Sequence, residues 1–122
     1  MKIAFDVSGT LDSEHYGVAI RYLLHHLKLL GHEITIWSNS SSYIKDFIEK
    51  YNIEGVNTMT KKSKHDLEPE DHMDICIEND RCQTYLAAKH IIWAHEVRNG
   101  KTVLDKIVDG SYKELGMNNV KD

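Results

Sequence analysis

Polar side chains follow each of four short apolar segments in the first two-thirds of the chain. Asp6 comes directly after the first segment, Ser38 after the second, several lysines after the third, and Glu78 after the fourth. A carboxylate can act as a nucleophile or hold a hard cation such as Mg²⁺, and a hydroxyl or an ammonium can hold phosphate oxygens. These residue types together predict a site for phosphoryl chemistry, provided that the fold brings the four segment ends to one edge.

The four apolar segments have the length and composition of buried β-strands, and they alternate with segments of helical periodicity. Between Gly17 and Gly31, apolar residues recur every three to four positions, and the serines within 38–42 precede a second helical pattern that ends at Tyr51. Alternating strands and helices are typical of parallel βαβ units. We therefore predict a single α/β domain over residues 1–122, with a three-layer, doubly wound, mainly parallel Rossmann-like sheet and functional groups at the carboxyl ends of its strands. The predicted strands span residues 2–5, 34–37, 56–59 and 73–77.

The remaining segments have less distinct patterns. Residues 60–71 are polar and hold the only proline, so we expect a loop with at most a short helix. Residues 85–97 fit one long helix, because no glycine or proline interrupts them; a short helix followed by a strand over 90–94 is the alternative. A final helix is expected over 101–115, packing Leu104, Ile107, Val108 and Leu115.

The composition excludes several classes of protein. With 41% hydrophobic and 28% charged residues among 122, the chain has the balance of a globular domain and not of a disordered one. The apolar runs are far shorter than a membrane span and no segment resembles a signal peptide, so we expect a cytoplasmic protein without a membrane partner. A net charge of −4 does not indicate a nucleic-acid ligand. Cys76 and Cys82 form no CxxC motif and are expected to be reduced thiols.

The polar segments, in their order along the chain, resemble the motifs of the haloacid dehalogenase superfamily. Residues 6–11 read Asp-Val-Ser-Gly-Thr-Leu, which is similar to the D-x-D-G-[TV] motif of its phosphatases. The run 34–39, which ends in Ser-Asn, resembles the second motif of the family. A lysine within 61–64 resembles the third motif, and the acids within 78–80 resemble the fourth. The resemblance covers roughly the first two-thirds of the chain, and it implies the capless core fold of this family.

The resemblance also implies a function, that of an Mg²⁺-dependent phosphohydrolase working through an aspartyl-phosphate on Asp6. The catalytic residues that it implies are Asp6, Ser8, Ser38 and Lys64. The phosphate-binding residues that it implies are Ser38, Asn39 and Lys64. The Mg²⁺ ligands that it implies are Asp6, the backbone carbonyl of Ser8, Glu78 and Asp80. Two choices stay open. Lys61 or Lys62 could replace Lys64 at the phosphate, and either Glu78 or Asp80 could be the acid that binds the metal.

Ser8 departs from the pattern of this family, whose usual phosphatases have an aspartate there as general acid and base. A serine hydroxyl is a poor acid and a poor base at neutral pH, so slow turnover is expected unless Asp12 or His15 assists. The alternative function is a catalytically impaired binding protein of the same fold that retains metal and phosphate recognition. A response-regulator receiver is not indicated, because Ser38 and Thr60 stand where a receiver has its phosphorylated aspartate.

The gaps at 11–17 and 51–56 are too short for an inserted cap domain, so the site is expected to be open. Small metabolites usually need a site that excludes water. The expected partner is therefore a phosphorylated substrate that is macromolecular or is enclosed by a neighbouring subunit.

The candidate site residues could also have purely structural roles. Asp6 could cap a loop, Ser38 could cap the following helix, and the acids within 78–80 could begin another helix.

Overall fold

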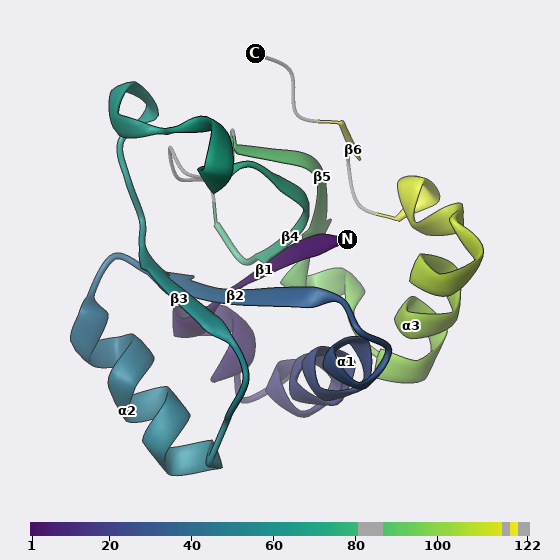
Figure 1. Ribbon diagram of the computed structural model, residues 1–122. Helices are drawn as coiled ribbons and strands as arrows, with labels where there is room; N and C mark the ends of the chain where they lie inside the picture. The colour runs from purple at the N-terminus through teal and green to yellow at the C-terminus, as the bar shows by residue number, and fades with distance from the viewer. Residues whose placement is uncertain (81–86, 116–117, 120–122) are drawn as a thin grey trace.

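Six strands form one sheet in the part of the chain that the computed structural model describes, residues 1–80, 87–115 and 118–119. The strand order is β3-β2-β1-β4-β5-β6 (Figure 1). The first five strands run parallel, and β6 pairs antiparallel with β5. The strands are β1 (Lys2–Asp6), β2 (Glu33–Ser38), β3 (Asn57–Thr60), β4 (Met73–Glu78), β5 (Ala88–Trp93) and β6 (Asn118–Asn119).

The α-helices of the described residues cover one face of this sheet (Figure 1). Ile3 and Phe5 of β1 point to that face and pack in one core cluster with Phe47 and Ile107, which come from the second and third helices. Burial of this apolar surface is the main favourable contribution to the fold. The helices are α1 (Gly17–Leu29), α2 (Ser41–Tyr51) and α3 (Gly100–Asp109).

The opposite face of the sheet carries a smaller apolar cluster that includes Ala4, Trp37 and Cys76. The connection 61–72, which holds two short 3-10 turns at Lys64–Asp66 and Pro69–Asp71, lies on that side. Among the described residues no α-helix packs there. The predicted α/β class and mainly parallel Rossmann-like sheet are confirmed, whereas the second helical layer of a three-layer fold is not found in the described part of the chain.

The prediction of one helix over 85–97 is wrong where the structure describes that range. Residues 88–93 form β5, which pairs with β4, and Ala94–Glu96 makes a single 3-10 turn. Ile91 and Ile92 are both buried, on opposite faces of the sheet. A strand covered on both faces is a continuous apolar run, and by pattern alone such a run is indistinguishable from a buried helical segment.

The predicted helix over 101–115 is shorter than expected. α3 ends at Asp109 because Gly110 adopts a left-handed conformation, with φ of 85°, and Ser111–Glu114 forms a separate 3-10 turn. Ile107 is buried, but Val108 is 63% exposed and does not pack in the core. The strands predicted before residue 80 and the first two helices are confirmed, with ends that differ by one or two residues.

The strand order reverses between β1 and β4, which lie side by side at the centre of the sheet. In doubly wound sheets the crevice beyond the carboxyl ends of the strands at such a switch point is where ligands bind. Asp6 ends β1 and Glu78 ends β4. The topology therefore brings two predicted site residues to this point.

No helix of the described residues is long and apolar enough to span a membrane. Cys76 is buried in the smaller apolar cluster, and Cys82 lies outside the described residues.

Candidate functional site

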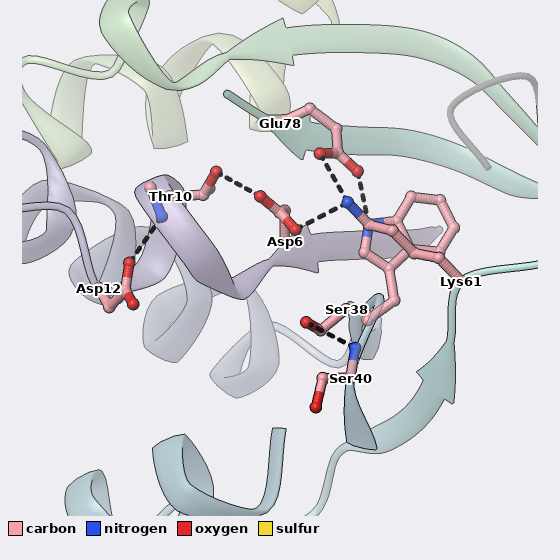
Figure 2. Close-up of polar contacts among 9 residues, drawn as sticks. Asp6, Thr10, Asp12, Ser38, Ser40, Lys61 and Glu78 are labelled. Atoms are coloured by element: carbon pink, nitrogen blue, oxygen red, sulfur yellow. Dashed lines mark hydrogen bonds and ion pairs between the residues drawn. The ribbon is translucent and has the colours of Figure 1, made fainter. Parts of the chain in front are cut away.

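Two buried carboxylates and one buried ammonium meet at the switch point (Figure 2). The Lys61 Nζ lies 2.8 Å from Asp6 Oδ1 and 3.2 Å from Glu78 Oε2. The Thr10 hydroxyl donates to Asp6 Oδ2 at 3.1 Å, and the Trp37 indole N–H donates to Glu78 Oε1 at 2.8 Å. Each carboxylate oxygen of this group thus has a hydrogen-bond donor. We call Asp6, Lys61 and Glu78 the charged trio.

Three separate segments position the charged trio. Asp6 and Glu78 point to the face of the sheet opposite the α-helices, on the same side as Trp37, because residues alternate between the two faces of a strand. Lys61 follows β3 directly, and its backbone N–H donates to the Ser38 carbonyl at 2.8 Å, which extends the β2–β3 pairing by one residue. The lysine side chain then reaches over the ends of β2 and β1 to the two acids.

Burial changes the proton affinity of both acids. Burial raises the pKa of Asp6 above its ordinary value of 3.8, and the hydrogen bond and charge of Lys61 oppose this shift. Burial, followed by the charge of Asp6, raises the pKa of Glu78 from 4.5 to about 8, against the opposing effects of Lys61 and Trp37. Glu78 therefore binds a proton more readily than an exposed glutamate does, because a second negative charge beside a single ammonium is unfavourable in a buried site.

The turn Val7–Leu11 after β1 brings the chain close to the end of β4. Gly9 has a φ of 73°, and a Cβ built on it would lie 2.2 Å from the Asn79 side-chain nitrogen. The Gly9 N–H donates to Asp12 Oδ1 at 2.7 Å, which fixes the turn (Figure 2). The positive φ favours glycine here, and a larger residue would also require the Asn79 side chain to move.

A polar cavity of about 250 Å³ opens beside the charged trio. Asp6 and Lys61 line it, whereas Glu78 is fully buried behind them. The cavity is lined by Asp6, Ser8, Ser38, Asn39, Tyr43, Lys61, Asn79 and Asp80. The structure thus brings together most of the predicted site residues.

Lys64 does not lie with the other predicted residues. It is exposed, on the 3-10 turn Lys64–Asp66, and does not line the cavity; the ammonium at Asp6 belongs to Lys61. Lys62 also points elsewhere and pairs with Asp71 at 2.9 Å. Of the three lysines that the sequence leaves open, the structure selects Lys61.

Thr10 and Trp37 contact the acids of the charged trio but were not among the predicted site residues. Thr10 belongs to the polar run 6–11, but its spacing of four from Asp6 is no helical signal, because Ser8 and Gly9 have non-helical backbone angles. Trp37 fits the general requirement that a buried indole N–H finds an acceptor. Its acceptor could not be predicted, because Trp37 and Glu78 lie on strands that are separated by β1.

The residues present fit a divalent cation only in part. Among the described residues no three His, Cys, Asp or Glu side chains gather in a way that could hold a metal ion. Asp6 and Glu78 approach the same point, but the Lys61 ammonium lies between them. Mg²⁺ would have to displace this ammonium, and its binding stays a prediction.

The comparisons with known proteins reveal a single distant structural likeness. No family model matches the sequence, and no curated protein matches it. A solved structure of the CMeT domain of the citrinin polyketide synthase has a TM-score of 0.46 and 19% sequence identity. The match covers 65% of this chain but only 21% of that one. A likeness at this level assigns no activity, so methyl transfer is not attributed to the chain.

The predicted membership of the haloacid dehalogenase superfamily is wrong. No model of that superfamily, or of any other family, matches the sequence. The predicted function, a phosphohydrolase with an aspartyl-phosphate intermediate, was inferred from that membership and is also wrong. The same holds for its alternative, a catalytically impaired member of the same family.

Proposed function

We propose that the chain binds a small polar ligand in the cavity beside the charged trio, with Asp6 and Lys61 as the recognition groups. The observation that carries this proposal is the position of a buried ion-pair network at the switch point of the sheet, open on one side to a polar cavity of about 250 Å³. Removing charged groups from water costs several kcal/mol per ion, and perturbed carboxylates in a cleft are typical of functional sites.

The cavity lining supports a ligand that both donates and accepts hydrogen bonds. Asp6 and Asp80 offer carboxylate oxygens, and Lys61 offers an ammonium. Ser38 and Asn39 directly precede α2, whose N-terminus carries a partial positive charge. A compact ligand with hydroxyl, amide or oxyanion groups matches this set, whereas an apolar ligand would leave these groups without partners.

A structural role for the charged trio is the second candidate. The observation that favours it is that every buried side-chain nitrogen and oxygen of the described residues has a hydrogen-bond partner. A fully satisfied polar network can fix the arrangement of strands without binding anything. In that case the trio would order the ends of β1, β3 and β4, and the cavity would hold only water.

A titration followed by amide NMR separates the two candidates. MgCl₂ and inorganic phosphate are tested first, each alone, because both remain predictions, followed by small amides, polyols and amino acids. A ligand of the cavity shifts the amides of Asn39 and Asn79, and Asn39→Ala weakens its binding. Asn57→Ala is the matched control, because Asn57 is exposed on β3 and does not line the cavity. If no compound shifts these amides, the structural role replaces the binding role.

A further inference from the structure

A second cavity of about 340 Å³ adjoins the polar one. The two share Ser8 and Tyr43 in their linings, so they are neighbours, and the second lies against α2. Asp12 lines the second cavity from the side of the Val7–Leu11 turn, and Asp46 lines it from α2. The ligand proposed for the polar cavity leaves this second space unused.

Aromatic rings form the α2 side of the second cavity. Asp46 and Phe47 follow Tyr43 by three and four positions, so each lies next to Tyr43 on the surface of the helix. Phe47 is buried and its ring centroid lies 4.8 Å from that of Tyr51. Tyr43 is 56% exposed, which is unusual for a large aromatic side chain and places its ring at the mouth of the cavity.

The aromatic side of the cavity already attracts cations from the chain itself. The Arg21 guanidinium carbon lies 4.4 Å from the centroid of the Tyr51 ring, and the Lys50 ammonium lies 5.3 Å from it. The face of an aromatic ring is electron-rich and binds organic cations, most strongly when carboxylates stand nearby. Asp12 and Asp46 supply two carboxylates to this lining, and the chain's own cations Lys50 and Arg21 lie on its Tyr51 side.

We propose that the second cavity is a binding site for an organic ammonium group, held between the Tyr43 ring and the carboxylates of Asp12 and Asp46. The feature that supports a small cation is the combination of the partly exposed Tyr43 ring with two carboxylates in one lining. The site goes beyond the function proposed above, because its charged groups are Asp12 and Asp46 in place of Asp6 and Lys61, and it does not require a ligand in the polar cavity.

Choline and its neutral isostere 3,3-dimethylbutan-1-ol test this proposal, because they share a shape and differ in charge. Choline is expected to shift the amides of Ser8 and Tyr43, and the isostere to bind more weakly. Tyr43→Ala and Asp46→Asn are each expected to weaken choline binding by about two- to fivefold, the factor that corresponds to a cation–π contact at an exposed site. Asp105→Asn is the control for net charge, because Asp105 is exposed on α3 and pairs with Lys101.

Three results would overturn the proposal. The first is that choline shifts neither amide, and the second is that the isostere binds as tightly as choline. The third is that Asp105→Asn weakens choline binding as much as Asp46→Asn, which would mean that only the overall charge matters. Asn39→Ala separates this site from the polar cavity, because it is expected to leave choline binding unchanged.

Discussion

Lys61 and Lys62 are neighbours in the chain, yet their ion pairs differ in almost every physical respect. The Lys61 side chain is 7% exposed and pairs with two buried acids, whereas that of Lys62 is 36% exposed and pairs with Asp71. Successive residues of an extended segment point in opposite directions. One lysine therefore reaches the switch point of the sheet, and the other remains at the protein surface.

The acids of the two ion pairs have opposite pKa shifts, although each lies next to a lysine. Burial dominates at Glu78 and raises its pKa to about 8. Burial also acts on Asp71, but a backbone hydrogen bond from Glu68 and the contact with Lys62 outweigh it, so that the pKa of Asp71 falls below 3.8. A lysine partner alone does not stabilise a carboxylate; the number of donors relative to the degree of burial decides the direction.

Replacing each lysine with methionine should give the largest difference between the two pairs. Lys61→Met removes the ammonium between two buried acids, and breaking a buried pair in this way costs about 3–5 kcal/mol of unfolding free energy. Chemical denaturation at pH 7 measures the loss. Lys62→Met is the matched control and should cause a much smaller loss, because its partner keeps the backbone hydrogen bond from Glu68. Equal losses of unfolding free energy in the two variants would show that the buried position of Lys61 does not make its ion pairs more important for stability than the surface pair of Lys62.

Replacing Glu78 with glutamine should change the pH dependence of stability. Between pH 4.5 and about 8, Glu78 is ionised in the unfolded chain but protonated in the folded one. The folded state binds more protons there, so the unfolding free energy of the wild type falls as pH rises, by up to about 1.4 kcal/mol per pH unit. Glu78→Gln removes this contribution, and its stability relative to the wild type should rise through that window and level off above it.

Denaturant titrations at several pH values measure this slope. The slope is a better readout than stability at one pH, because glutamine also alters the hydrogen bonds to Trp37 and Lys61. Identical slopes in wild type and variant would mean that Glu78 is ionised in the folded protein at neutral pH.

The sequence predicts the two acids of the trio better than the lysine between them. Asp6 and Glu78 directly follow apolar strands, and parallel strands bring such residues to one edge. Three lysines fall within 61–64, a segment without periodicity, and the selection of Lys61 depends on one backbone hydrogen bond to Ser38. That bond requires the pairing of β2 with β3, which is a property of the folded sheet and not of the local sequence.

The same limit explains the errors in the fold. Ile91 and Ile92 belong to a short apolar run that suits a helix or a strand equally, and only pairing with β4 decides between them. The family resemblance failed for a related reason. Short polar motifs after strands recur in many α/β proteins, because any such sheet places its functional groups at that edge.

Replacing Asp71 with asparagine should have the smallest effect and the opposite dependence on pH. Asp71 Oδ2 accepts from the Glu68 backbone N–H at 2.8 Å and caps the 3-10 turn that begins at Pro69. Loss of such a cap costs about 1 kcal/mol. Because the folded pKa of Asp71 lies below 3.8, its contribution is fully present above that pH and is lost as the pH falls through the folded value. Denaturation curves at pH 7 and pH 3 should therefore show Asp71→Asn less stable than the wild type at pH 7, with the gap narrowing at pH 3. If the difference in unfolding free energy between Asp71→Asn and the wild type widens at pH 3, the pKa of Asp71 is raised in the folded protein, as that of Glu78 is.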